Sequence, residues 1–436
     1  MTFSNRWFVL LALGIAPLLL GLFSPAFLVI TPLWCGALLV ATFVDYLLLP
    51  APKSFELSRE VEPQVSLGAE NAVRVLLRNP HSWAWRVTVH DEPPASFPHD
   101  FTDSTFVLPA EQRRALTYHI LPRKRGDFQF GDLWLRIEGK LGLVNRQRKF
   151  PSAQPIKVYP NLLEAAKFTL MARKGRLQHV GIRAARLNGA GSNFESLREY
   201  TPDDEYRRID WKATARRGKL ISRQYEVERS QNVIIAIDVG RTMMAEIDGI
   251  AKMDYAVNAA LLLAYVATLT DDKVGLLVFA DGVQTWMPPQ KGRAQVYRIL
   301  DALYNAEARR SESDYHRAFG YLATRWRKRS LVVCFTDLWD PDSSRQTIQE
   351  LSFLQPRHLV ACVSLLDTKV LRRVDAPLNT PGDVYEQGVA LQMLDDRARA
   401  LGELQRRGVL VVDTSADKLS AALVNRYLEV KERMQL

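Results

Sequence analysis

The N-terminal apolar segment constrains the fold of this chain more than any other feature. Asp45 is the only charged residue in the segment Trp7–Leu49, and Ser24-Pro25 divides that segment into two apolar stretches. A helix needs about 20 apolar residues to cross the hydrocarbon of a bilayer. Because the connection is so short, two crossing helices must run antiparallel. The sequence therefore predicts a two-helix transmembrane hairpin over residues 1–53.

The charges around this segment predict its orientation. Arg6 precedes it, Lys53 and Arg59 follow it, and the turn carries no charge. The positive-inside rule then places both ends in the cytoplasm. We expect a two-pass protein of the inner (cytoplasmic) membrane with cytoplasmic soluble domains. A cleaved signal peptide over residues 6–23 is the alternative, although a second apolar stretch follows at once and no cleavage site is convincing. The place of Asp45 near the end of the second stretch favours the membrane interface over an intramembrane functional carboxylate.

Charge and cysteine content narrow the classes of function. The net charge is +10, and a Lys/Arg excess beside a membrane segment suits a protein lying near an anionic leaflet. Nucleic-acid binding is the competing interpretation, but the chain has no zinc-finger or aromatic RNA-binding signature. The three cysteines, Cys35, Cys334 and Cys362, lack metal or redox spacing. We expect core thiols in a reducing compartment.

Short alternating runs predict the first soluble domain. Ala72–Leu77, Trp85–Val89 and Leu133–Ile137 alternate apolar and polar residues, and Pro and Gly clusters separate such runs. Several short strands at close spacing are typical of a β-sandwich or barrel. The sequence therefore predicts an all-β, sandwich-like domain over residues 54–160.

After residue 230 the pattern changes to buried strands alternating with amphipathic helices. The apolar runs are Val233–Ile237, Val274–Phe279, Leu331–Phe335, Leu359–Leu365 and Val409–Val412. This alternation is typical of a mainly parallel sheet with helices on both faces. We expect a Rossmann-like α/β domain over residues 231–436, joined to the β domain by a charged connector over residues 161–230. The fold class is therefore multidomain.

The end of the first predicted α/β strand resembles the metal-ion-dependent adhesion site of von Willebrand A domains. That family pattern is Asp-x-Ser-x-Ser, with a Thr or Ser from a second loop and an Asp after a later strand. Asp238 and Thr242 match the first carboxylate and the second serine, Asp337 matches the later carboxylate, and Ser313 is a substitute for the second-loop hydroxyl. Gly240 stands in the first serine position. The resemblance implies Mg²⁺, a hard cation that prefers oxygen ligands.

This ion site is degenerate, because a glycine offers no side-chain oxygen. A structural alternative is that Asp238 caps a helix or pairs with Arg241, and that Asp337 ends a buried strand. The chain has no P-loop, no HExxH and no Gly-x-Ser-x-Gly motif. We therefore predict no catalytic residue and no cofactor other than the ion.

The connector carries a second resemblance. Its run Ser196-Leu197-Arg198-Glu199-Tyr200 leads through Pro202 to Arg208-Ile209-Asp210-Trp211 and then to Ala215-Arg216. This resembles the signature of the bacterial domain-of-unknown-function family fifty-eight, with Asp203 replacing the usual glycine and Glu205 the second aspartate. That family combines paired N-terminal helices, a β domain and a von Willebrand A-like domain, so the resemblance covers nearly the whole chain.

Charged and aromatic side chains alternate within this signature. Such a pattern favours an interdomain network of Arg–carboxylate pairs with aromatic stacking, and a direct partner-binding site is the alternative. The residues concerned are Arg198, Tyr200, Asp204, Arg208, Asp210, Trp211 and Arg216.

The resemblance also implies a partner among the MoxR-type AAA+ ATPases, in complex maturation, stress or cell-envelope processes. With no enzyme motif found, we expect a membrane-anchored, cytoplasm-facing protein-interaction adaptor that contacts the lipid bilayer and a protein but no nucleic acid. Two alternatives remain. One is a metal-dependent hydrolase using Asp238 and Asp337, and the other is a structural organiser of a membrane complex that works without an ATPase.

Overall fold

The protein is a mixed α/β, multidomain chain. The computed structural model describes residues 2–20, 26–160, 194–200, 206, 209–225, 230–339 and 344–433. The chain divides into two compact units, Met1–Tyr159 and Pro160–Leu436.

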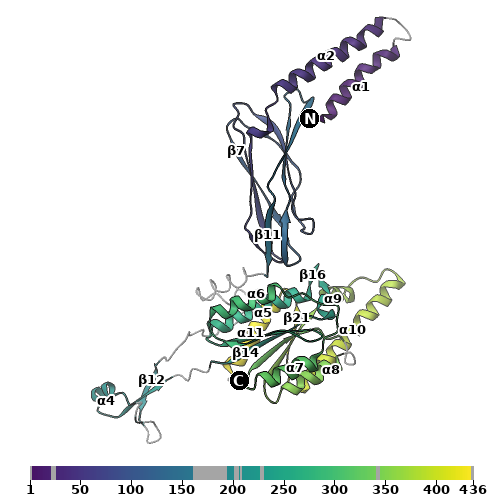
Figure 1. The fold of residues 1–436 in the computed structure, drawn as a ribbon. Coiled ribbons are helices and arrows are strands. Elements are labelled where there is room, and N and C mark those ends of the chain that lie inside the picture. Colours follow the sequence, from purple (N-terminus) through teal and green to yellow (C-terminus); the bar gives the residue numbers. More distant parts are fainter. Residues whose placement is uncertain are drawn as a thin grey trace. The chain divides into compact units, whose positions relative to one another are not determined.

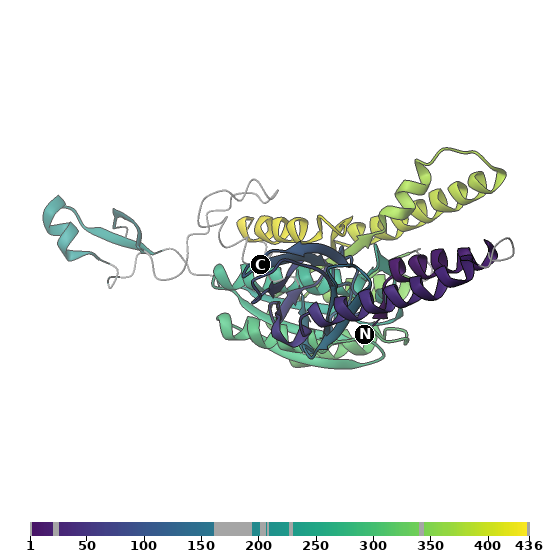
Figure 2. The same ribbon diagram turned by 90° about the horizontal axis from the view of Figure 1, so that it is seen from above.

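Two apolar helices begin the first unit. α1 (Asn5–Leu20) and α2 (Ala26–Leu48) lie side by side in both views (Figures 1 and 2). Trp7 Nε1 donates a hydrogen bond to Thr42 Oγ1 at 3.0 Å across this contact. Among the residues that the structure describes, one helical stretch, Val29–Ser54, could cross a membrane by length and composition, and 22% of its apolar window is buried within the protein. A signal sequence would pass the same test of length and composition.

After the short 3-10 helix η1 (Pro52–Ser54), the regular structure of the first unit consists of β-sheets. One sheet has the order β1-β10-β9-β5-β6, a second β2-β4-β7 and a third β3-β11-β8. Their strands are β1 (Thr2–Phe3), β2 (Glu56–Glu60), β3 (Gln64–Ser66), β4 (Asn71–Arg78), β5 (Trp85–Asp91), β6 (Ser104–Leu108), β7 (Arg113–Ile120), β8 (Gly126–Phe130), β9 (Leu133–Glu138), β10 (Val144–Phe150) and β11 (Gln154–Tyr159). Neighbouring strands are antiparallel except β3 and β11.

The alternation of apolar residues in these strands forms the core of the β domain. In β4, Val73, Val75 and Leu77 are at most 1% exposed, while the residues between them point outward or are half-buried. Since successive side chains of a strand point to opposite faces, one face is buried. A charged pair lies in this core as well. The Arg59 guanidinium pairs with Asp91, and Tyr118 donates to the same carboxylate at 2.6 Å.

Asp45 joins the end of α2 to the loop between β9 and β10. Its carboxylate is 0% exposed and accepts hydrogen bonds from the backbone amides of Leu141 (2.9 Å), Leu143 (3.0 Å) and Val144 (3.2 Å). Arg146 donates to the carbonyl of Leu49 at 2.8 Å. The partners of Asp45 are therefore backbone amides of the β domain, which its position in the sequence did not indicate.

The second unit is built on a six-stranded sheet of order β18-β17-β14-β19-β20-β21. β14 (Asn232–Asp238), β17 (Lys273–Phe279), β19 (Leu331–Phe335), β20 (Leu359–Leu366) and β21 (Leu410–Ser415) are parallel. β18 (Val283–Gln290) is an antiparallel edge strand. The inner strands read as continuous apolar runs because helices cover both of their faces.

Helices cover both faces of this sheet (Figure 1). α5 (Lys252–Leu269), α6 (Arg293–Tyr304) and α11 (Leu419–Glu432) lie on one face. α7 (Tyr315–Arg325), α8 (Arg345–Leu354) and α10 (Pro381–Arg406) pack on the other, around a core that includes Cys334 and Cys362. Both thiols are buried, as predicted, whereas Cys35 in α2, also predicted to be a core thiol, is only half-buried. This part also contains the short hairpin of β15 (Glu246–Ile247) and β16 (Ile250–Ala251), and the short helix α9 (Thr368–Val374).

The strand order reverses between β14 and β19. From β14 the chain passes through α5 to β17 on one side, and then returns through α6 and α7 to β19 on the other. In open α/β sheets, ligands bind beyond the carboxyl ends of the strands at such a switch point. The topology therefore places a candidate site where Asp238 ends β14 and where Asp337 follows β19.

Candidate binding pocket

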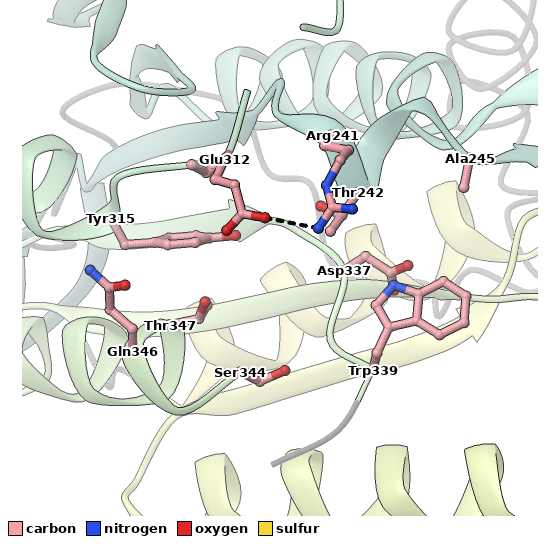
Figure 3. Close-up of a pocket in the computed structure, with 11 residues that line it drawn as sticks. Arg241, Thr242, Ala245, Glu312, Tyr315, Asp337, Trp339, Ser344, Gln346 and Thr347 are labelled. Carbon is pink, nitrogen blue, oxygen red and sulfur yellow. Dashed lines mark hydrogen bonds and ion pairs between the residues drawn. The ribbon is translucent and has the colours of Figure 1, made fainter. Parts of the chain in front are cut away.

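A pocket of about 470 Å³ opens at this switch point (Figure 3). Residues from four segments line it: the short helix η4 (Arg241–Met244) after β14, the loop before α7, the loop after β19 and the start of α8. The lining residues are Arg241, Thr242, Ala245, Glu312, Ser313, Tyr315, Asp337, Trp339, Ser344, Gln346 and Thr347. Arg241 donates to Glu312 at 2.8 Å, and both side chains are largely exposed. The wall is thus mostly polar, with two aromatic side chains, Tyr315 and Trp339, on it.

Hydroxyl and amide donors surround the carboxylate of Asp238. This residue is 0% exposed. Its Oδ1 accepts from the amide of Gly240 at 2.8 Å and from the Ser313 hydroxyl. Its Oδ2 accepts from Tyr315 at 2.6 Å and from Thr336 at 3.0 Å. A buried carboxylate needs such donors because burial removes its water.

Tyr315 is held in its protonated form by this arrangement. Burial of the phenol, followed by the nearby negative charge of Asp238, raises the pKa of Tyr315 well above its usual value. The hydroxyl therefore keeps its proton at neutral pH and donates a hydrogen bond to Asp238. It also lies 2.7 Å from the hydroxyl of Thr336.

Two cationic side chains surround the second carboxylate, Asp337. Its Oδ2 lies 2.5 Å from Lys252 Nζ, and its Oδ1 accepts from Arg397 at 2.9 Å and from Ser364 at 3.3 Å. Lys252, Asp337 and Arg397 are 2%, 5% and 7% exposed. Arg397 also bonds Asp413 at 2.9 Å, so this second acid shares the positive charge.

As they stand, these residues do not fit a divalent ion. Mg²⁺ demands near-octahedral oxygen ligands at about 2.1 Å. Here both oxygens of Asp238 and both oxygens of Asp337 already accept hydrogen bonds from the protein. An ammonium group lies directly against Asp337. Among the described residues, no cluster of three His, Cys, Asp or Glu side chains is placed to hold a metal.

Gly240 also has a structural reason to be a glycine. A Cβ at this position would lie 2.1 Å from Ser313 Oγ and 3.1 Å from Asp238 Oδ1. The space that a serine side chain would need is taken by the hydroxyl of Ser313. Position 240 therefore departs from the Asp-x-Ser-x-Ser pattern because Ser313, which contacts Asp238, leaves no room for a serine side chain there.

The structure brings together all four residues proposed as metal ligands. Thr242, Ser313 and Asp337 line the pocket, and Asp238 lies beneath it, bonded to Ser313. Arg241 pairs with Glu312, in contrast to the alternative in which it pairs with Asp238.

Sequence reasoning missed the residues that hold the two carboxylates in place. These are Tyr315, Thr336, Lys252 and Arg397. Tyr315 and Thr336 stand within two residues of a proposed ligand, so the same motif could have indicated them as neighbours of the site. A basic residue in the first turn of a mostly apolar helix was the signal for Lys252, because the helix dipole disfavours a cation there.

The described part of the connector contains a small β-hairpin with a helix between its strands in the chain. β12 (Phe194–Glu199) pairs antiparallel with β13 (Ile221–Tyr225), and α4 (Trp211–Arg217) lies between them in the chain. Asp210 caps α4, since its side chain accepts from the amide of Ala213. Gly218 ends α4 at a φ of 67°, in the left-handed region that favours glycine.

The aromatic residues of this hairpin are exposed. Trp211 is 55% exposed and lies edge-to-face with Tyr206, which is 69% exposed, at 5.6 Å between ring centroids. Tyr200 is half-buried, and Arg216 is exposed. Asp204, Arg208 and the side chain of Arg198 lie outside the described residues. Asp210 thus has a local role as a helix cap.

Fold and pocket together define a multidomain α/β protein with a candidate ligand pocket at the carboxyl edge of a mostly parallel sheet. Residues 196–378 match the model of the family described as "Protein of unknown function DUF58", so the chain carries a domain of this family. The chain is 25% identical over 255 residues to uncharacterized protein Rv1480 of Mycobacterium tuberculosis, covering 55% of this chain and 78% of that protein. It is 27% identical over 125 residues to uncharacterized protein YeaD of Bacillus subtilis, covering 28% of this chain and 30% of that protein. The names of these relatives state no catalytic activity.

Solved structures resemble about a quarter of the chain. The CARDB domain of a Pyrococcus furiosus protein is 11% identical with a TM-score of 0.18, covering 24% of this chain and 87% of that domain. A Caenorhabditis elegans protein of the MSP family is 8% identical with a TM-score of 0.16, covering 24% of this chain and 96% of that protein. A TM-score below 0.5 does not establish a shared fold.

Proposed function

We propose that this protein is a membrane-anchored adaptor that faces the cytoplasm and binds a protein partner at the pocket of its α/β domain. In this proposal the α/β domain is of the von Willebrand A type. The resemblance of the signature implies a MoxR-type AAA+ ATPase as the partner, in complex maturation, stress or cell-envelope processes.

The observation that carries the proposal is the pocket at the switch point. Four separate segments meet there. Its wall combines an exposed Arg241–Glu312 pair with Trp339, which is 37% exposed. Trp and Arg are the residue types most enriched at the energetically dominant positions of protein interfaces. A polar pocket with an exposed tryptophan on its wall therefore suits an inserted side chain of another protein.

Exposed apolar side chains on the N-terminal helices support the membrane anchor. In α2, Leu33, Val40 and Leu47 are 68%, 65% and 65% exposed, and in α1, Phe8 and Leu13 are 54% and 59% exposed. Apolar surface of this extent is costly in water and favourable in lipid. In this proposal both helices cross the inner membrane, and both ends of the hairpin lie in the cytoplasm.

The hairpin formed by β12, α4 and β13 offers a second contact surface. Besides Tyr206 and Trp211, it exposes the basic residues Lys212, Arg216 and Arg217 on α4. Aromatic and arginine side chains exposed together favour recognition of a partner over an internal network.

Capture of the ATPase by the full-length protein in detergent tests the proposal. The wild-type chain should retain a MoxR-type ATPase from the same organism. Arg241→Glu, which reverses a charge at the exposed edge of the pocket, should weaken capture about tenfold or more. Arg407→Glu is the matched control, because Arg407 forms an exposed pair with Glu403 within its own helical segment.

Two results would contradict the proposal. The first is no retention of the ATPase with or without nucleotide and Mg²⁺. The second is capture that Arg241→Glu and Arg407→Glu weaken equally, since the pocket would then have no special role.

A further inference from the structure

The ammonium group of Lys252 lies at the start of α5, next to a carboxylate of the pocket. Lys252 is the first residue of α5, and its Nζ lies 2.5 Å from Asp337 Oδ2 and 4.7 Å from the centroid of the Trp339 ring. Asp337 and Trp339 both line the pocket at the switch point. The positive charge of Lys252 therefore lies next to two residues of the pocket wall, a carboxylate and an aromatic ring.

This placement is energetically demanding. A cation in the first turn of a helix is opposed by the helix dipole, and a Lys side chain that is 2% exposed has lost its water. Only the Asp337 carboxylate and the Trp339 ring compensate it among the contacts described for Lys252. The ammonium group is thus buried against a carboxylate that itself lines the pocket.

The oxygen atoms around the pocket also leave no place for a metal ion. Asp238 is surrounded by neutral donors, and Ser313 fills the space beside Gly240 where a further hydroxyl would stand. Two unit charges about 4 Å apart interact strongly at the low effective dielectric of a protein interior. A divalent ion bound beside Asp337 would therefore be repelled by Lys252 and also by Arg397.

We propose that the Lys252 ammonium is a built-in cation that takes the place of a divalent metal ion at this pocket, so that the pocket works without metal. The inference concerns the pocket itself and stands whether or not the ATPase partner proposed above is found. It also gives a physical reason for the glycine at position 240. With the cation supplied by the chain, the hydroxyl that would ligate a metal is not needed.

Manganese titration of the full-length protein in detergent tests this inference. Free Mn²⁺ is followed by electron paramagnetic resonance, and thermal unfolding is measured in EDTA and in Mn²⁺. The wild type should bind no Mn²⁺ at this pocket, and its melting temperature should be the same in both media. Lys252→Ala removes the ammonium and leaves Asp337 paired with Arg397. This variant should bind Mn²⁺ at least about tenfold more tightly than the wild type and should be stabilised by it.

Two further variants make the comparison specific. Lys252→Arg keeps the positive charge and should remain insensitive to Mn²⁺. Lys291→Ala removes a lysine from an exposed pair with Asp271 and should behave as the wild type.

The inference is overturned by either of two results. One is stoichiometric Mn²⁺ binding by the wild type that Asp337→Asn abolishes, a measurement that needs no Lys252 variant to fold. The other is a folded Lys252→Ala protein that binds Mn²⁺ no better than the wild type. Neither result depends on capture of the ATPase, so failure of this inference and failure of the proposed function are separable.

Discussion

At the residue scale, the carboxylate that ends β14 and the one that follows the neighbouring strand β19 are both buried, and different groups stabilise each of them. Asp238 is stabilised by hydroxyl groups and one backbone amide, whereas Asp337 is stabilised by two cations. Breaking a buried ion pair by removing one partner commonly costs about 3–5 kcal/mol, because an uncompensated charge remains. The two acids thus have different surroundings, although the sequence motif assigns both of them as metal ligands.

The contact between Gly240 and Ser313 yields a prediction of steric coupling. Gly240→Ser should destabilise the α/β domain by about 1–3 kcal/mol, because its Cβ would lie 2.1 Å from Ser313 Oγ. Adding Ser313→Ala removes that hydroxyl and should recover part of the loss. Chemical denaturation of the single and double variants measures both effects. Strictly additive losses would show that the two positions do not compete for space.

His358 predicts a pH dependence of stability. It is 2% exposed, and neither ring nitrogen has a hydrogen-bond partner among the described residues. Burial, followed by the positive charges of Arg357 and Arg329, lowers the pKa of His358 below its usual 6.5. The unfolded chain therefore binds this proton more readily than the folded one, and stability falls as the pH drops below about 6.5.

His358→Phe should remove this contribution. Between about pH 7.5 and pH 5.5, the melting temperature of the variant should fall less than that of the wild type. His316 provides a control of opposite sign, since Glu350 raises the pKa of this exposed histidine. Its contribution is present at low pH and is lost as the pH rises through the folded pKa, so His316→Gln should not reduce the acid sensitivity. Equal slopes for wild type and His358→Phe would contradict the prediction.

At the element scale, the main finding is the link between α2 and the loop that follows β9. Asp45→Ala would leave the amides of Leu141, Leu143 and Val144 without their acceptor, at a cost of about 1–3 kcal/mol for each amide that water does not reach. Hydrogen–deuterium exchange should become faster at these three amides. Asp103→Ala, which removes an exposed partner of His90, is the matched control. Unchanged exchange in the Asp45 variant would mean that the carboxylate does not hold the loop.

At the scale of the whole molecule, the two-pass arrangement of the proposed function makes a topological prediction. A green fluorescent protein fused after the C-terminus should fluoresce in cells, because both ends of the apolar hairpin are expected in the cytoplasm. Alkaline phosphatase fused at the same place should be inactive, and the same enzyme fused after Ser24 should be active. An active C-terminal phosphatase fusion would instead fit a single crossing or a cleaved signal sequence.

Local patterns in the sequence were enough to locate many of the elements. The apolar runs Val233–Ile237, Val274–Phe279 and Leu331–Phe335 coincide with β14, β17 and β19, because buried strands require continuous apolar residues. The alternation in Trp85–Val89 likewise falls in β5. The positions of Asp238 and Asp337 could be predicted for the same reason, because one carboxylate ends such a strand and the other follows one.

What only the tertiary structure decided is which groups meet these carboxylates. Lys252 reaches Asp337 across 85 positions of the chain, and Arg397 reaches it across 60. Tyr315 reaches Asp238 across 77 positions. Strand and helix periodicity follows from the neighbours of each residue along the chain, so the sequence determines it directly. The pairing of buried charges depends on which loops the strand order brings to one edge of the sheet, and that order is settled only when the whole domain packs.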